Sequence, residues 1–181
     1  METKSKIGIT GKIRARFYDQ ESLSFWQKRW NKFALFLGRK DLYILGSLKR
    51  EESFNNIICD TGINAHIRRL AHDTTFTGRI THMALGTGGV PAGRPNGTET
   101  TLFTEHYRNP TSAFTVSGNR AFVTAFFTET ETSGVFTNFG NFIDGTATIN
   151  TGQLWTLVRV AWQKTLTEAL VVDCEYTFNN A

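Results

Sequence analysis

The glycine-rich stretch of residues 86–97 is the part of the chain whose composition most invites a chemical interpretation. Residues 88–95 read GGVPAGRP, which approaches the loop that cradles phosphates in nucleotide-binding proteins. That loop needs a lysine followed by a serine or threonine, but here Arg94 and Pro95 occupy these positions. No helix pattern follows, and Pro91 stands where a dinucleotide-binding loop has its third glycine. The sequence therefore argues against nucleotide binding at this loop.

A second candidate is the triplet Asp60-Thr61-Gly62, which follows a short apolar run. Two apolar residues followed by Asp-Thr-Gly resemble the active-site loop of aspartic proteases, where two carboxylates share one proton. The chain has one such triplet, so the second carboxylate would have to come from another copy in a homodimer. Asp60 fits equally the N-cap of a short helix with apolar residues at positions 63, 67 and 70. We favour the helix cap.

The other reactive side chains form no recognisable site. Cys59 and Cys174 lie in apolar, strand-like runs, which predicts buried free thiols. No histidine has a carboxylate or cysteine partner at a metal-ligand spacing, and no Gly-x-Ser-x-Gly nucleophile motif occurs. We therefore expect no catalytic residue, no metal and no cofactor, and a binding or structural protein rather than an enzyme. The four histidines are His66, His72, His82 and His106.

The length of 181 residues suits a single domain, residues 1–181, with a complete hydrophobic core. The net charge of +4 conceals an asymmetry, because residues 1–50 hold 12 Lys and Arg against 4 Asp and Glu, whereas residues 51–181 hold 8 against 12. The basic part could face nucleic acid, an anionic surface, an acidic protein neighbour or solvent. No apolar run reaches the roughly 18 residues of a membrane span. Met1–Lys6 is not followed by the apolar core of a secretory signal, so we expect neither feature.

Two elements of the basic part are predicted from their periodicity. Residues 7–18 alternate between an apolar and a basic face, as in a strand with one side in water. Residues 21–37 change to helical spacing, with Ser22 or Ser24 as a possible cap and Gly38 as a stop. Residues 42–48 form a strand or a connector. The apolar residues of the helix are Phe25, Trp26, Trp30, Phe33, Phe36 and Leu37, and Lys28, Arg29 and Lys32 lie among them.

This aromatic and basic helix has more than one interpretation. It could pack on the domain's own core, lie on a membrane surface, or supply phosphate contacts and base stacking to a nucleic acid, although no known nucleic-acid module is present. We treat residues 21–48 as an insertion or docking arm for another subunit, because aromatic and arginine side chains are favoured at interface cores. The predicted interface residues are Trp26, Lys28, Arg29, Trp30, Phe33, Phe36 and Arg94.

The rest of the chain is predicted to be almost all strand. A strand at 54–59 and a helix from Asp60 to about His72 precede a strand at 80–85. After the glycine-rich loop, apolar alternation predicts strands at 113–117, 121–129, 135–143, 154–162 and 170–178, with a hairpin at Gly118-Asn119. We predict a mostly β fold, a single antiparallel β-sandwich of jelly-roll type with one or two short α-helices.

The order of three motifs resembles a class of tailed-bacteriophage virion proteins, the β-sandwich components of tails, fibres, baseplates or head accessories. Residues 55–64, NNIICDTGIN, give a strand and then a helix start. Residues 80–88 read ITHMALGTG, and residues 100–108, TTLFTEHYR, carry the pattern Thr-x-Leu-x-x-Glu-x-x-Arg. The resemblance covers roughly residues 54–178 and does not include the segment 21–48.

The resemblance implies a non-enzymatic structural subunit that forms a homo-oligomer, contacts other virion proteins, and is assembled into the virion in the host cytoplasm. The tail, baseplate or fibre is the first expected place, and a capsid or neck accessory such as a decoration or head-fibre protein is the alternative. A nucleic-acid or glycan-binding module is an alternative of another class. The residues with predicted structural roles are Asp60 as helix N-cap, Gly86 and Gly88 in the loop, Leu102 as an anchor, and Glu105 with Arg108, three positions apart.

Overall fold

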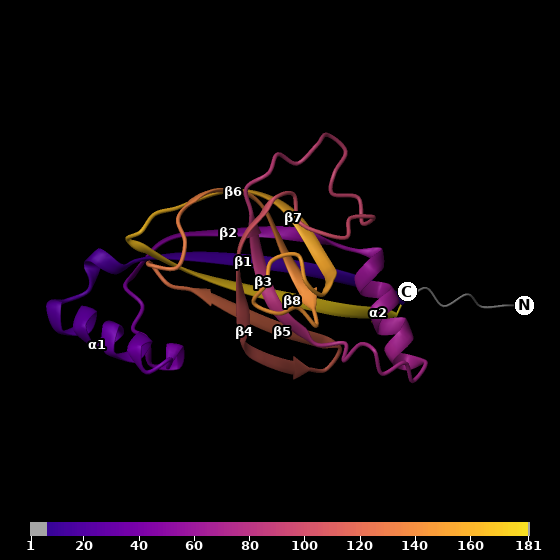
Figure 1. Cartoon of the computed structure of the whole chain (residues 1–181), viewed down its shortest axis with the longest axis horizontal. Coiled ribbons are helices and arrows are strands. Elements are labelled where there is room, and N and C mark those ends of the chain that lie inside the picture. The colour runs from indigo at the N-terminus through magenta and orange to yellow at the C-terminus, as the bar shows by residue number, and fades with distance from the viewer. Residues whose placement is uncertain (1–6, 181) are drawn as a thin grey trace, which may run out of the picture.

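The computed structural model describes residues 7–180, and Met1–Lys6, expected to carry no secretory signal, lies outside them. Within the described residues, strands dominate and two α-helices interrupt them (Figure 1). The elements in chain order are β1 (Ile7–Asp19), η1 (Gln20–Ser22), α1 (Phe25–Phe36), η2 (Lys40–Leu42), β2 (Ser47–Ile58), α2 (Asp60–Leu70), β3 (Ile80–Gly86), β4 (Glu105–Ser117), β5 (Arg120–Phe127), β6 (Gly134–Ile143), β7 (Gln153–Lys164) and β8 (Glu168–Asn180), where η marks a 3-10 helix.

The strands form a closed barrel in the order β1-β2-β7-β6-β3-β4-β5-β8, with every neighbouring pair antiparallel. The prediction of a jelly-roll-like β-sandwich is therefore wrong. Alternation of apolar residues and the spacing of turns identify strands and their faces. Sandwiches and barrels share these patterns, which do not tell whether the edge strands of the sheet pair with each other and close it. The ring closes between β2 and β7 through a short contact, Ile57 with Leu157 and Ile58 with Thr156.

Two strands extend further than the sequence pattern indicated. β2 begins at Ser47, so the charged run 49–52, which lies between the predicted elements 42–48 and 54–59, belongs to the ladder with β1. β4 begins at Glu105 instead of residue 113. The structure confirms the other strands to within a few residues, and it confirms the hairpin, where Gly118 has a φ of +58°. Charged residues can continue these strands because the outer faces of β1, β2, β5 and β8 are in contact with water.

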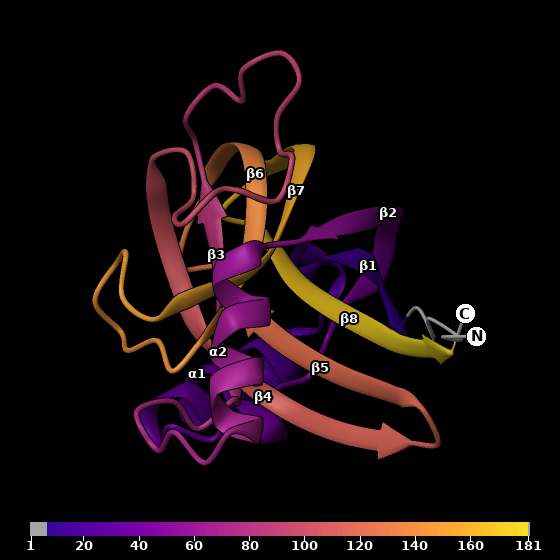
Figure 2. The same ribbon diagram turned by 90° about the vertical axis from the view of Figure 1, so that its right-hand side faces the viewer.

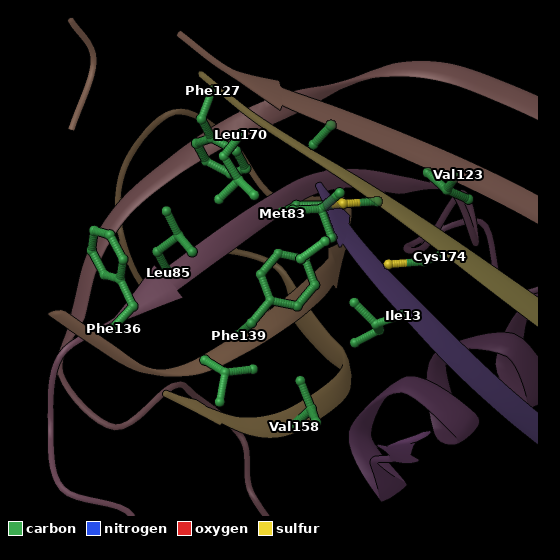
Figure 3. Close-up of a cluster of buried hydrophobic side chains, with 14 of the residues drawn as sticks. Ile13, Met83, Leu85, Val123, Phe127, Phe136, Phe139, Val158, Leu170 and Cys174 are labelled. Atoms are coloured by element: carbon green, nitrogen blue, oxygen red, sulfur yellow. The ribbon is translucent and has the colours of Figure 1, made fainter. Parts of the chain in front are cut away.

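The core lies inside the barrel, and every strand contributes side chains to it. In β4 these come from the first part of the strand, where Tyr107 packs against the core. Large aromatic side chains fill it, and Phe17, Phe139 and Trp162 stack edge to face or tilted within 6.0 Å between ring centroids. The predicted buried free thiols are confirmed, since Cys59 and Cys174 are both buried and unpaired. Figure 3 shows part of this core, with side chains converging from β1, β3, β5, β6, β7 and β8: Ile13, Met83, Leu85, Val123, Phe127, Phe136, Phe139, Val158, Leu170 and Cys174.

The two helices occupy opposite ends of the molecule. Helix α2 lies against the barrel next to β7, whereas α1 projects from the far end on the connection between β1 and β2 (Figures 1 and 2). The glycine-rich connection between β3 and β4 rises above the barrel away from α1 (Figure 1). The barrel therefore presents three separate features to its surroundings: the α1 arm, the long loop and the α2 end.

Candidate protein-docking surface

Helix α1 is well defined at both ends by its own sequence. At the start, the backbone N–H of Ser24 donates to Gln27 Oε1 at 2.9 Å and the N–H of Gln27 donates to Ser24 Oγ at 3.4 Å, forming a capping box. At the end, Gly38 has a φ of +67° and its N–H donates to the Leu35 carbonyl at 3.0 Å, while Arg39 N–H donates to the Ala34 carbonyl at 2.9 Å. This is a Schellman ending, which favours glycine. The predicted cap at Ser24 and stop at Gly38 are confirmed.

Side-chain hydrogen bonds hold α1 to the chain that follows it. Asn31, 3% exposed, donates from Nδ2 to the Ile44 carbonyl at 2.8 Å and accepts the Ile44 N–H on Oδ1 at 2.8 Å. Trp30 Nε1 donates to the Leu42 carbonyl at 2.9 Å. Since these bonds fix the backbone of residues 42–44, the helix and its return segment form one unit.

That unit is fastened to the barrel by residues 40–43. The ring of Tyr43 packs against Phe126 with centroids 5.0 Å apart, and its hydroxyl group donates to the Glu129 carboxylate. Burial, together with the Glu129 carboxylate, raises the pKa of the Tyr43 hydroxyl far above its usual range, so it stays protonated and able to donate. Lys40 forms an ion pair with Glu131. The arm therefore has a definite position relative to the barrel, although most of its own surface is in water.

The side chains that α1 leaves exposed are its largest apolar ones. At 100° per residue they fall within about 140° of the helix circumference, which makes one continuous face. The opposite side carries the buried Ala34 and Asn31, which bonds to the return segment. Isolated exposed apolar residues are ordinary, but a contiguous group of this size marks an interaction site. The exposed fractions are Phe25 65%, Trp26 75%, Trp30 44%, Phe33 51%, Phe36 85% and Leu37 50%, and we call this set the α1 face.

Helix α1 also carries most of the positive charge that the basic part leaves unpaired. Within residues 7–50, salt bridges to carboxylates engage the lysines and arginines of β1, β2 and the η2 region: Arg14, Arg16, Arg39, Lys40, Lys49 and Arg50. Four basic residues of that range form no salt bridge, and three of them, Lys28, Arg29 and Lys32, lie on α1. The charge asymmetry of the sequence is thus largely compensated inside the fold, except at this helix.

The structure brings six of the seven predicted interface residues together. Trp26, Lys28, Arg29, Trp30, Phe33 and Phe36 all lie on α1, whereas Arg94 lies in the glycine-rich connection at a different end of the molecule (Figures 1 and 2). The Arg94 guanidinium group is engaged locally, by Glu99 at 2.9 Å and by Thr98 Oγ1 at 2.6 Å. Arg94 therefore does not share a surface with the six residues of α1. Sequence reasoning also missed Asn31 as the anchor, although an amide within an aromatic helix is an unusual choice that could have signalled it.

The Asp-Thr-Gly triplet forms the first turn of α2 rather than a loop between strands. The helix begins at Asp60 with Cys59 as its N-cap, so the prediction of Asp60 as the cap is wrong by one position. Thr61 Oγ1 donates to the Leu154 carbonyl at 2.8 Å, and a Cβ at Gly62 would stand 2.6 Å from Trp155 Cα. These two residues dock the helix on β7, while the Asp60 carboxylate lies in the positively polarised first turn.

The glycines with predicted structural roles occupy positions where a side chain would collide. A Cβ on Gly86 would lie 2.3 Å from Asn138 Oδ1, and one on Gly88 would lie 2.6 Å from Thr104 Oγ1. Leu102, 5% exposed, packs in a small cluster of buried apolar residues where the loop rejoins the barrel, which confirms it as an anchor. The loop is thus fixed at both ends by close packing.

Glu105 and Arg108 form the predicted pair, in a more buried setting than the sequence indicated. Both side chains are almost completely buried, and Arg108 Nη2 donates to Glu105 Oε2 at 2.6 Å. Residues three apart on a regular strand face opposite sides, but the register against β3 shifts here, because Gly86 pairs with Glu105 while Leu85 pairs with Tyr107. The bulge returns Glu105 to the side of Arg108. Arg108 Nη1 also donates to the Thr151 carbonyl at 3.0 Å, which ties down the connection between β6 and β7.

The histidines remain separate in the fold. His66 lies with its ring 4.7 Å from that of Trp155, and burial lowers the pKa of His66, an effect that Asp144 partly opposes. Burial also lowers the pKa of His82, whose Nδ1 lies 3.2 Å from Thr81 Oγ1. Across residues 7–180, no three His, Cys, Asp or Glu side chains gather closely enough to hold a metal ion. No helix in that range is both long and apolar enough to cross a membrane.

No protein-family model, no curated protein sequence and no solved structure matches the chain.

Proposed function

We propose that the protein is a non-enzymatic structural subunit of a bacteriophage particle, placed in the tail, baseplate or fibre, and that α1 attaches it to a neighbouring subunit. The observation that carries the attachment is the α1 face, a continuous exposed group of aromatic side chains on a helix with fixed ends. The phage setting rests on the order of motifs along residues 54–178.

The chemistry of the α1 face indicates the character of the neighbour. Aromatic and Arg side chains are enriched at protein interfaces, and helix α1 supplies both, with Arg29 beside the α1 face. Lys28, Arg29 and Lys32 lack carboxylate partners within the described residues, so an acidic rim on the neighbour would complement them. In a homo-oligomer on a symmetric particle, several such contacts act together and raise the overall attachment.

The test is whether the chain enters particles and whether α1 is needed. Particles assembled with the wild-type chain should contain it at a fixed copy number by mass spectrometry, in the tail fraction. Particles assembled with the variant Trp26→Ser/Phe36→Ser should contain at most about a tenth as much, since two interface anchors cost several kcal/mol. The matched control, Phe114→Ser/Val116→Ser, changes exposed apolar residues of β4 and should leave incorporation unchanged.

Three results would count against the proposal. The chain could be missing from purified particles, the α1 variant could be incorporated at the wild-type level, or the chain could be confined to capsids. The last result would instead favour a decoration or head-fibre role. Charge reversal by Lys28→Glu/Lys32→Glu separates the acidic-neighbour model from pure apolar docking, because only the former predicts a loss of attachment that depends on salt concentration.

A further inference from the structure

A cavity of about 250 Å³ lies between helix α2 and the inner face of the barrel strands. Helix α2 lies at the end of the molecule opposite α1 (Figure 1). Residues from α2, from the connection before β3 together with the first residue of β3, and from β4, β5, β7 and β8 contribute to the cavity wall. The strands β1, β4, β5 and β8 extend toward this end of the molecule, as Figure 2 shows, and α2 supplies one side of the cavity wall. Ligand sites are common at such barrel mouths.

The floor of the cavity is apolar and rigid. Val123, Trp155 and Tyr176 line it, and each is 1% exposed. The rings of Trp155 and Tyr176 lie edge to face with centroids 5.8 Å apart. Tyr176 is held from behind by Asn141, which donates to its hydroxyl group. A floor whose side chains are fixed by other contacts is already shaped for a ligand, so binding need not order it.

One buried polar group in this wall lacks a partner. The indole Nε1 of Trp155 is buried and makes no hydrogen bond to any described residue. An indole N–H is a donor only, and leaving a donor unsatisfied in the interior costs free energy. The Nε1 atom has almost no accessible surface, so a ligand in the cavity does not reach it without a shift of the ring, and the indole N–H serves below as a reporter of binding.

The mouth combines apolar side chains with a single formal charge. Phe114 and Phe178, which are 68% and 42% exposed, stand at the opening. Arg79 is the one lining residue with a formal charge at pH 7, and its guanidinium group has no salt bridge or hydrogen bond within residues 7–180. His66 completes the wall on the α2 side, where its ring meets that of Trp155.

We propose that this cavity is a binding site for a small organic anion with an apolar, aromatic or short aliphatic body. The body lies against Val123, Trp155 and Tyr176, and the anionic group pairs with Arg79 at the mouth. A dry cavity of about 150 Å³ in another protein holds one benzene molecule, so the larger space here suits a body of two fused rings or a chain of similar bulk. The site is independent of the α1 face.

The test uses three probes with one apolar body: 2-naphthoate, 2-naphthamide and 2-naphthylmethylammonium. The four indole N–H groups are followed in ¹⁵N-labelled protein by NMR, and Trp155→Phe assigns the relevant signal. Naphthoate should shift the Trp155 signal saturably and leave Trp162, which is equally buried in the core, unchanged. Trp26 and Trp30 report on the α1 face and should also stay unchanged.

Comparing the affinities of the anionic, neutral and cationic probes tests the role of Arg79. Naphthoate should bind about fivefold more tightly than naphthamide, the increment of one charge-assisted contact at a partly solvated site, and the cation should bind most weakly. Arg79→Gln should abolish the preference for naphthoate over naphthamide while leaving naphthamide affinity unchanged.

The apolar body is examined by filling the space. Ala121→Trp places a large side chain in the wall of the cavity and should reduce naphthoate affinity at least about tenfold, because it removes the volume that the rings need. Ala113→Trp, an exposed position of the neighbouring strand outside the wall, should bind naphthoate like the wild type.

The proposal is overturned if no probe shifts the Trp155 signal at millimolar concentration, or if the shifts appear at Trp26 and Trp30 instead. It is also overturned if the cation binds as well as the anion, or if folded Ala121→Trp retains wild-type affinity. Should Ala121→Trp not fold, the wild-type indole map and Arg79→Gln still decide the question.

Discussion

Helices α1 and α2 differ in how they are attached to the same barrel. In both, the largest apolar side chains remain in water, including Trp26 and Phe36 on α1 and Leu70 on α2. Helix α2 nevertheless touches β7 so closely that a Cβ on Gly62 would overlap its backbone, whereas α1 is held by hydrogen bonds to its own return segment. Small residues let α2 become part of the core, and polar residues keep α1 outside it.

The contrast indicates that apolar content alone does not tell which helix supports the fold. The predicted apolar face of α2 contributes little, since Ile67 is 56% exposed and only Ile63 packs against the core. The contacts that count are those of Gly62, Ala65 and His66, a set with little apolar area. Helix α2 should therefore affect global stability, and α1 should affect association.

The largest expected effect comes from disturbing the α2 contact. Gly62→Val places a branched side chain 2.6 Å from the Trp155 backbone, so the helix must move away from β7. We expect the free energy of unfolding to fall by about 3 kcal/mol, the upper range for overpacking. Urea denaturation followed by circular dichroism measures it. Gly89→Ala, where nothing lies within 4 Å, should change stability by less than about 0.5 kcal/mol. Equal effects from both variants would refute the tight contact.

The next effect concerns the start of α1. Ser24→Ala removes one acceptor of the capping box and should cost the helix about 1 kcal/mol. Because α1 lies outside the core, the loss should appear as faster amide hydrogen exchange in α1 with unchanged exchange in β3 and β6. An equal increase of amide hydrogen exchange in β3 and β6 would show that α1 unfolds together with the barrel.

A smaller effect should distinguish the helices through pH. Burial holds the pKa of His66 below its ordinary value of 6.5. The folded state therefore binds fewer protons than the unfolded chain, so the stabilisation is complete above about pH 6.5 and is lost as pH falls through the folded pKa. His66→Gln should reduce this decline in stability between about pH 7 and pH 5. Thermal unfolding of both proteins across that range gives the difference. Identical pH profiles would mean that His66 is not buried neutral against Trp155.

The smallest effect on stability is expected at the surface of α1. Phe36 is 85% exposed, so Phe36→Ser should change the free energy of unfolding by less than about 0.5 kcal/mol. The paired substitution Ala34→Ser, at a fully buried position of the same helix, should cost more. If Phe36→Ser were strongly destabilising in the isolated chain, the side chain would pack on the protein itself, and the α1 face would not be free to dock.

Much of the secondary structure could be predicted, because alternation and capping are local properties. Residues 7–18 and Ser24 with Gly38 behaved as their patterns indicated. The closed barrel could not be predicted, because its closure depends on a two-residue contact between β2 and β7 that no periodicity encodes. The long start of β2 was missed because its charged run resembles a loop, yet its outward residues only need water or opposite charges on β1 and β8.

Local sequence patterns were enough to locate only part of the candidate sites. Helical spacing placed six interface residues on one element, but it could not separate Arg94, whose position depends on the path of a long loop. The cavity under α2 was invisible in the sequence. Its wall comes from six separate segments that only the barrel brings together, among them those of Arg79, Val123 and Tyr176.

The buried pair of Glu105 and Arg108 has a consequence for how the strands choose their alignment. Both charges are acceptable in this buried layer, beneath the connection between β6 and β7, only because the bulge in β4 places them side by side. If β4 slipped by one residue against β3, its side chains would exchange faces and each charge would lose its partner or enter an apolar layer. An uncompensated buried charge costs roughly 3–5 kcal/mol, so misaligned pairings are penalised more heavily than a purely apolar strand could penalise them. The ion pair thus selects the native register of β4 by destabilising the alternatives.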